Sequence, residues 1–300
     1  MKKKIEDEIM NFLSMPDKAS KENRRLGIDK PAQKVICNYL KEMFLDNPKN
    51  TIFDDKFIQA ISGSGDELFK MNAPWSSSLC ALLFFYNVNK DNPLTINEVE
   101  YTESYFEVKN EVFDSPSNMD VVLKGKKGEQ EYLLFVECKF TEYLTPGTTY
   151  ISPKYKKNDT YNALLNNDNK LKLVNHSKNN YIAYWNGERL FADGIKQIIA
   201  HSIGLTNFVK KNIKKDRYSD SRKSLFEKDY KVSFVEIIFN FGTIFKNEYN
   251  NYFAAVEHLM DLIKIEGVEM LKPLSYQKLL EKNKTFKLEE KVIDYYHYNK

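Results

Sequence analysis

Two carboxylates and a lysine stand at the ends of two apolar segments of the chain. Glu137 and Lys139 follow the apolar run of residues 132–136, and Asp120 lies at the start of a strand-like stretch over 119–124. Carboxylates bind hard divalent cations, and such a cation, with a water molecule and a nearby lysine, can hydrolyse a phosphodiester. The residue types therefore point to metal-assisted phosphodiester chemistry.

The surroundings of Glu137 and Lys139 set them apart from chance occurrences of an acid two residues before a lysine. Similar triplets recur at residues 54–56, 107–109, 168–170, 229–231 and 289–291. Four of these lie in polar surroundings typical of the surface, and residues 107–109 have alternating neighbours, as on a half-exposed edge strand. The five apolar residues before Glu137 instead predict a strand covered on both faces. Charged groups there need a partner or a metal.

A hairpin would bring the three groups together. Side chains two residues apart on a strand share a face, so Glu137 and Lys139 point the same way. Residues 124–130 are rich in glycine and lysine and predict the turn. Folding the chain about this turn places Asp120 near Val136 and Glu137. The residues alone leave a second interpretation open, a buried ion pair of Lys139 with Asp120 or Glu137.

The wider pattern predicts a helix, three strands, a helix and a strand in the middle of the chain. Apolar periodicity favours helices over residues 3–14, 31–46, 54–61 and 79–86, then strands over 98–108, 119–124 and 131–140. A further helix over 193–211 and a buried strand over 232–241 precede helices over 247–265, 275–283 and 287–296. Residues 144–180 predict an insertion or long loop beside the active face, with a weak helix near 159–165.

Composition indicates a globular protein in a reducing compartment. The chain has 300 residues, 42% of them hydrophobic and 14% aromatic. Its three cysteines fit neither a zinc spacing nor a disulfide framework, which predicts a cytoplasmic location. The longest apolar run, residues 79–86, is too short to span a membrane, and charged residues 6–8 follow the basic start where a signal peptide needs an apolar region. A soluble protein is expected.

Basic clusters give the chain a means of binding nucleic acid. The net charge of +3 permits such binding without requiring it. Lysines interleaved with tyrosine suit phosphate backbones and exposed bases, and the candidates are Lys154, Lys156, Lys157, Lys210, Lys211 and Lys214. Solvated helix faces explain each cluster equally well.

The two halves of the motif resemble the PD-(D/E)xK nuclease superfamily, the restriction-endonuclease-like fold. The resemblance rests on Ser-Pro-Ser-Asn-Met-Asp at 115–120 and Phe-Val-Glu-Cys-Lys-Phe at 135–140. Pro116 precedes Asp120 by four residues, whereas the family pattern has one. Four flanking segments are similar to a prokaryotic branch of the superfamily, namely residues 63–68, 75–79, 141–144 and 274–280, so that the resemblance covers much of 61–295.

The resemblance implies an α/β fold with a restriction-endonuclease-like core, a mixed central sheet flanked by helices in the order αβββαβ. Residues 61–245 would form this core, with the insertion at 144–180. Residues 1–60 would be an N-terminal helical region, and residues 246–300 would be C-terminal helices packed on the core.

The resemblance also implies roles for individual residues. Asp120 and Glu137 would bind Mg²⁺ together with the backbone carbonyl of Cys138, with Mn²⁺ as a substitute. Lys139 would orient the attacking water or help to deprotonate it. Glu67 would add a carboxylate from the preceding helix, although an exposed first-turn glutamate is an equal explanation. Gln197 would be a polar group beside the site.

Three other polar features near the motif have structural explanations of equal weight. His201 lies one turn after Gln197, and a lone helix histidine is more often structural than catalytic. Glu142 either supports the site, pairs with Lys154 or is solvated. The serines at 76–78 either contact a phosphate or cap a helix.

The expected function is a metal-dependent endodeoxyribonuclease that acts in restriction or defence. The sequence leaves DNA and RNA both open as substrates, and a homodimer is expected because cutting two strands usually needs two sites. One alternative is a non-catalytic nucleic-acid-binding module that keeps the nuclease fold. The other is a structural or interaction protein in which the buried charges form only an ion pair.

Overall fold

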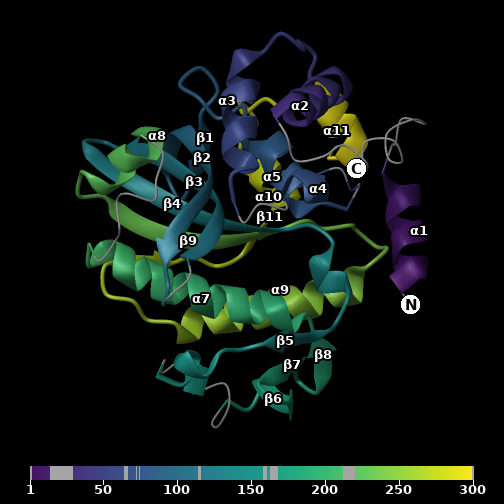
Figure 1. The fold of residues 1–300 in the computed structure, drawn as a ribbon, viewed down its shortest axis with the longest axis vertical. Coiled ribbons are helices and arrows are strands. Elements are labelled where there is room, and N and C mark those ends of the chain that lie inside the picture. Colours follow the sequence, from purple (N-terminus) through teal and green to yellow (C-terminus); the bar gives the residue numbers. More distant parts are fainter. Residues whose placement is uncertain are drawn as a thin grey trace.

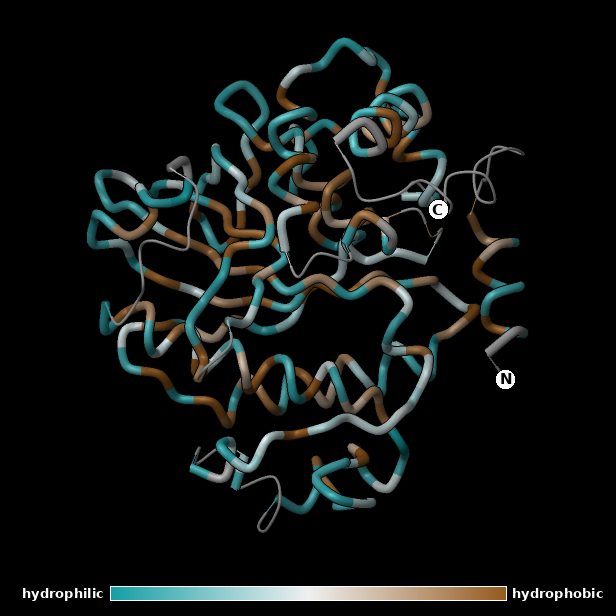
Figure 2. Tube along the Cα trace, viewed as in Figure 1, coloured by the Kyte–Doolittle hydropathy of each residue, from teal (hydrophilic) through white to brown (hydrophobic). Residues whose placement is uncertain are grey.

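Two β-sheets with helices between and around them make up the structure (Figure 1). The computed structural model describes residues 2–13, 30–63, 67–71, 73, 75–113, 116–157, 161–162, 168–211 and 220–298. Buried hydrophobic side chains run from Ile9 to Tyr298, so elements from both ends of the chain contribute to the same core. In Figure 2, brown apolar residues are frequent along the central strands and helices, and the outer loops are mostly teal.

The larger sheet is mixed. Its strands are β1 (Leu94–Ile96), β2 (Val99–Glu111), β3 (Pro116–Lys127), β4 (Gln130–Lys139), β9 (Lys231–Ile238), β10 (Val268–Met270) and β11 (Leu274–Ser275). Strands β1 to β4 pair antiparallel in chain order, and β9 pairs parallel with β4, β10 and β11. The predicted mixed central sheet is therefore confirmed.

The hairpin of β3 and β4 forms as predicted, with a tighter turn. Lys127 pairs with Gln130, so the turn is Gly128 and Glu129, and Gly128 has φ of 61°, a conformation that glycine adopts without strain. The antiparallel register continues to the pair Val121 and Val136. This register brings Asp120 and Glu137 to the same end of the hairpin.

Helices cover both faces of the larger sheet. Helices α3 (Thr51–Ala60) and α5 (Ser77–Phe85) pack on one face, and every residue from Leu79 to Phe85 is buried, as expected for a helix that is apolar all round. On the other face, α7 (Ala192–Val209) packs on β2 and β3, and α9 (Lys246–Leu262) lies beside it (Figure 1). The order α5, β2, β3, β4, α7, β9 agrees with the predicted order of elements.

The long loop considered for residues 144–180 is wrong, because these residues contribute to a second sheet, whereas the alternative, an insertion, stays a prediction. Its strands are β5 (Thr148–Tyr150), β6 (Leu171–Ser177), β7 (Asn180–Trp185) and β8 (Glu188–Leu190). Helix α7 contacts both sheets and α9 contacts the smaller one, and both helices lie between the two sheets (Figure 1). The Asn186-Gly187 pair, with φ of 49° and 90°, is a typical hairpin signal that indicates β7 and β8 from sequence. The weak helix expected near 159–165 lies largely outside the described residues.

Shorter elements complete the fold. The remaining helices are α1 (Lys2–Phe12), α2 (Lys30–Phe44), α4 (Glu67–Met71), α8 (Asp220–Lys223), α10 (Tyr276–Lys282) and α11 (Glu290–Tyr296), with 3₁₀ turns η2 (Glu142–Leu144), η3 (Pro153–Lys157) and η5 (Ser224–Phe226). Across the described ranges, no helix combines the length and the apolar character that crossing a bilayer requires.

Candidate active site

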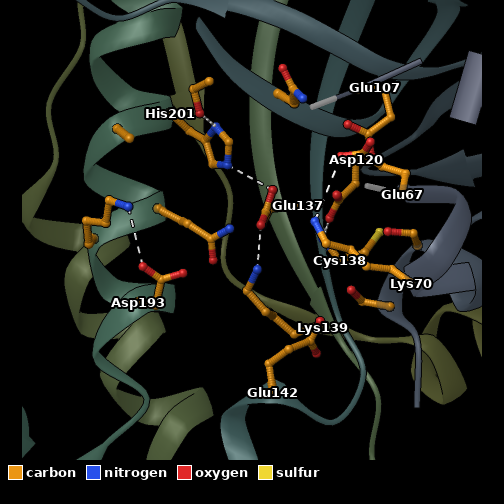
Figure 3. A pocket seen from close by; sticks show the side chains of 18 of the residues that line it. Glu67, Lys70, Glu107, Asp120, Glu137, Cys138, Lys139, Glu142, Asp193 and His201 are labelled. Atoms are coloured by element: carbon orange, nitrogen blue, oxygen red, sulfur yellow. Dashed lines mark hydrogen bonds and ion pairs between the residues drawn. The ribbon is translucent and has the colours of Figure 1, made fainter. Parts of the chain in front are cut away.

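A pocket of about 1060 Å³ opens where β2, β3 and β4 meet α4 and the first half of α7 (Figure 3). All five residues expected to be catalytic line it, namely Asp120, Glu137, Lys139, Glu67 and Gln197. Cys138, Glu142, Lys154, His201 and the serines at 76–78 line it as well. The fold therefore brings together residues that are far apart in the chain.

The strands β3 and β4 separate at the pocket, and Asp120 bridges the gap. Their backbone pairing ends at Val121 and Val136, and one residue further the Cys138 N–H donates to Asp120 Oδ2 at 2.7 Å. A side-chain carboxylate thus replaces the backbone acceptor that a continuing strand would supply. This bond fixes the Asp120 carboxyl group at the start of the Glu137-Cys138-Lys139 segment.

Glu137 lies between two nitrogen-bearing side chains, Lys139 and His201. Lys139 donates to Glu137 Oε1, and His201 Nε2 lies 2.8 Å from Glu137 Oε2 (Figure 3). Burial opposes the charged form, but the positive charges of Lys139 and His201 outweigh it and lower the pKa of Glu137 to about 2. The ion pair of Glu137 and Lys139, one of the two interpretations of the sequence, is present.

A series of polar contacts connects the Glu137–Lys139 pair, through His201 of α7, to Ser117 of β3. His201 Nδ1 lies 2.7 Å from Ser117 Oγ, so the series runs Ser117, His201, Glu137, Lys139. His201 is 1% exposed and contacts the motif directly, a role that its sequence signal, one turn after Gln197, only hinted at.

Glu236 is a further buried carboxyl group, beside Glu137 in the parallel register of β4 and β9. Burial, together with the charge of Glu137, raises the pKa of Glu236 to about 8, although Lys139 and the Tyr252 hydroxyl act against the shift. Burial opposes the charged form of Lys139, but the negative charges of Glu137 and Glu236 raise the pKa of its ammonium group. Lys139 therefore keeps its proton here and donates to Glu137 Oε1. Glu236 was not identified from the sequence. The signal was the same as for Glu137, a charged residue in or next to an apolar run, here residues 232–241.

On the other side of the pocket, Glu67 and Glu107 lie near Asp120 (Figure 3). A side chain added at Gly63 would overlap the carboxyl groups of both Glu67 and Glu107, so these two groups meet above that glycine. Glu67 is 3% and Glu107 6% exposed. The first-turn surface position considered for Glu67 and the half-exposed edge expected for Glu107 are both wrong.

The backbone of Glu107 is unusual. Its neighbours Phe106 and Val108 pair with Val121 and Met119, but Glu107 has φ of 49°, which is uncommon for a residue with a side chain. Arg222 donates to the Glu107 carbonyl at 3.1 Å and stabilises this conformation. Such local strain is frequent at functional sites.

The carboxyl groups on this side repel one another. Burial, and then the charges of Asp120, Glu67 and Glu137, raise the pKa of Glu107 well above its ordinary value. Burial and the charge of Glu137 likewise raise the pKa of Asp120, although Lys139 and the Cys138 N–H oppose the rise. Lys70 lies 3.9 Å from Glu67, but its side chain is 51% exposed, so it offsets little of this charge.

The donor chemistry on this side suits a hard divalent cation. Glu67, Glu107 and Asp120 offer carboxylate oxygens, which Mg²⁺ prefers, and a cation would offset their repulsion. As the side chains stand, no three His, Cys, Asp or Glu residues within the described ranges are arranged to hold a metal ion. The role of the Cys138 carbonyl as a ligand stays a prediction.

Lysines from several elements surround the carboxylates. Lys70, Lys109, Lys154 and Lys196 all line the pocket. Of the lysines expected to bind nucleic acid, Lys154 is thus at the pocket, while Lys157 is exposed but does not line it. Lys210 and Lys211 lie at the far end of α7, where Lys211 pairs with Asp229 at 2.8 Å. The side chain of Lys156 and all of Lys214 lie outside the described residues.

Several polar neighbours hold the local backbone in place. Ser76 caps α5 by accepting from the Leu79 N–H at 3.1 Å, which supports the capping explanation for that serine. Glu142 Oε2 accepts from the N–H groups of Phe140 and Thr141 at 2.9 and 3.0 Å, and so supports the chain where β4 ends. Gln197 lies on the pocket side of α7, between Asp193 and His201.

Comparison of the chain with protein-family models, with curated proteins and with solved structures finds no match. The resemblance to the PD-(D/E)xK nucleases therefore rests on the quoted motifs alone.

Proposed function

We propose that the protein is a Mg²⁺-dependent nuclease that hydrolyses phosphodiester bonds of DNA, with a restriction-endonuclease-like core. The observation that carries the proposal is the convergence of the buried carboxyl groups of Glu67 and Glu107 and the half-buried carboxyl group of Asp120 beside the Glu137–Lys139 pair, in a pocket lined by lysines. Buried carboxylates that repel one another are costly for stability and are typical of functional sites.

Different residues of the pocket would bind the cation, orient the water and attract the phosphate. Asp120 and Glu107, with Glu67, would hold the cation through carboxylate oxygens, and Mn²⁺ would substitute for Mg²⁺. When bound, the cation would polarise the phosphate and lower the pKa of the attacking water. Lys139 is a buried ammonium group held by Glu137, so it would orient the water and stabilise negative charge on the phosphate. His201 positions Glu137, and the pocket lysines attract the phosphate backbone.

The biological setting belongs to the same proposal. A role in restriction or defence is proposed from the motif resemblance alone, and a homodimer from the need to cut two strands. The three cysteines are buried and form no disulfide, which suits a reducing cytoplasm.

The test is cleavage of supercoiled plasmid and of end-labelled oligonucleotides by the purified chain with Mg²⁺, Mn²⁺ or EDTA. Variants Asp120→Asn, Glu107→Gln and Lys139→Met remove charge with little change of volume, and the melting temperature of each is measured alongside, because Lys139→Met also removes the partner of Glu137. Glu103→Gln is the matched control, because Glu103 lies on the same strand as Glu107 and pairs with Lys124 away from the pocket. Cleavage that requires the cation and is lost in the three variants but kept in the control supports the proposal. Cleavage that persists in Asp120→Asn would overturn it.

A non-catalytic nucleic-acid-binding module is the second candidate. One observation favours it, since Lys139 pairs with one oxygen of Glu137 and His201 Nε2 lies 2.8 Å from the other, as in a structural ion-pair network. Salt-sensitive DNA binding by the wild-type protein, with no cleavage in either Mg²⁺ or Mn²⁺, would favour this candidate over the nuclease.

A further inference from the structure

An exposed aromatic ring stands at the lining of the pocket. Phe113, two residues after β2, is 38% exposed, and among the exposed large hydrophobic side chains of the described residues it is the one that lines the pocket. Its ring meets the ring of Tyr155, from η3, edge to face, with centroids 5.2 Å apart and planes at 78°. We call Phe113 and Tyr155 the aromatic shelf.

The aromatic shelf packs against two further tyrosine rings, those of Tyr161 and Tyr181. Tyr155 is 8% exposed and meets Tyr161 at 6.4 Å, and Tyr161 in turn meets Tyr181 of β7 at 6.0 Å. This series of edge-to-face contacts ties the shelf to the smaller sheet. Phe113 therefore keeps part of its ring in solvent while its position is fixed by packing.

Positive charge accompanies the shelf. Lys109, four residues before Phe113 along the chain, and Lys154, next to Tyr155, both line the pocket. Aromatic rings that stack with bases, beside lysines that contact phosphates, are the combination by which proteins bind single-stranded nucleic acid. The shelf and its lysines thus fit a nucleotide whose base is unpaired.

The burial of the carboxylates within the pocket also favours a nucleotide whose base is unpaired. Glu67, Glu107, Glu137 and Lys139 are each at most 6% exposed, so a phosphate must enter the pocket to reach them. Duplex DNA is a stiff rod with its bases stacked inside. A pocket of about 1060 Å³ accommodates an extruded nucleotide or a short stretch of one strand instead.

We infer that the substrate is single-stranded or locally unpaired DNA, with one unpaired base stacked on Phe113 while Lys109 and Lys154 contact the flanking phosphates. This inference rests on the proposed nuclease function and specifies its substrate class. Phe113 would be a substrate-binding residue that sets the preference for unpaired over paired DNA.

The test measures binding without cleavage, in EDTA, to a single-stranded oligonucleotide and to the same sequence as a duplex. Variants are Phe113→Leu, which keeps apolar volume without an aromatic face, and Phe113→Trp, which keeps the face. The matched control is Tyr150→Ala, because Tyr150 is an aromatic residue, 56% exposed, that does not line the pocket. A fluorescent base analogue in the oligonucleotide reports stacking directly.

The wild type should bind the single strand more tightly than the duplex and quench the analogue. Phe113→Leu should weaken single-strand binding about fivefold or more and lose the quenching. Phe113→Trp and Tyr150→Ala should resemble the wild type, and all variants should melt at the same temperature. Equal affinity of the wild type for both DNA forms, or unchanged binding and quenching in Phe113→Leu, would overturn the inference.

Cleavage assays distinguish a failure of the single-strand inference from a failure of the nuclease proposal. If the wild type still cuts duplex DNA with Mg²⁺ while the shelf makes no difference, the nuclease proposal stands and the inference falls. If the wild type neither binds nor cuts any DNA, both fall together.

Discussion

The two sides of the pocket both carry carboxyl groups, but the pKa values of these groups are shifted in opposite directions. On one side, Glu137 is bracketed by Lys139 and His201, and its pKa is lowered to about 2. On the other, Glu107 and Asp120 lie near further carboxyl groups, and their pKa values are raised. All of these groups are buried or line the pocket, so burial alone does not explain the contrast; the partners do.

This contrast separates charges that stabilise the fold from charges that are available to a ligand. A buried pair such as Glu137 and Lys139 is satisfied within the protein, and removing one partner leaves a costly unpaired charge. Mutually repelling carboxylates have the opposite property, since loss of one relieves the others. Stability and activity should therefore respond in opposite ways to substitution on the two sides.

The largest effect on stability is expected on the paired side. Glu137→Gln removes the carboxylate that contacts both Lys139 and His201, so we expect the free energy of unfolding to fall by about 3–5 kcal/mol. Urea denaturation followed by circular dichroism measures the loss. Glu107→Gln is the matched substitution on the other side and should not destabilise the metal-free protein. A comparable loss in both variants would contradict the distinction between the two sides.

The largest effect on activity without a loss of stability is expected for Asp120→Asn. The asparagine oxygen can still accept from the Cys138 N–H, so the strand geometry should persist. Removing the charge should lower the cleavage rate on the order of 10²–10³-fold or more, while the melting temperature without metal stays equal or rises. Single-turnover cleavage and thermal melting of the same sample provide both readouts. A marked drop in melting temperature would show that Asp120 is mainly structural.

Cation binding should stabilise the protein through the repelling side. At a Mg²⁺ concentration 100 times the Kd, the stability should rise by about 2.7 kcal/mol. Scanning calorimetry with and without Mg²⁺ measures the shift. Glu107→Gln should reduce it and Glu103→Gln, away from the pocket, should leave it unchanged. An equal shift in both variants would place the cation elsewhere.

The smallest effect concerns the pH dependence set by Glu236. Its pKa is raised to about 8, so between about pH 4.5 and 8 the folded protein binds more protons than the unfolded chain, and stability falls as pH rises. Glu236→Gln should remove this part of the decline and leave the protein more stable than the wild type above pH 7. Melting temperatures from pH 5 to 9 test this. Parallel curves for wild type and variant would count against the raised pKa.

The sequence was most informative where a local pattern is enough to determine structure. The apolar run before Glu137 and the glycine-containing turn at 128 predict the β3–β4 hairpin, and the register then places Asp120 beside the Glu137 segment. The smaller sheet was missed because lysines and asparagines in residues 148–190 obscure the alternation of its short strands, and only the Asn186-Gly187 turn signals it.

The amino-acid sequence by itself determined the strands β2, β3, β4 and β9 and the main helices beside them, and that Asp120, Glu137 and Lys139 share one end of a hairpin, because periodicity and turn residues act over a few neighbouring positions. Only the tertiary structure decided that His201 and Lys139 neutralise Glu137, and that Glu67 and Glu107 join Asp120 with their charges unbalanced. Those contacts join α4, β2, β3, β4 and α7, elements far apart in the chain. Electrostatic interactions depend on distance and burial in space, which no local pattern encodes.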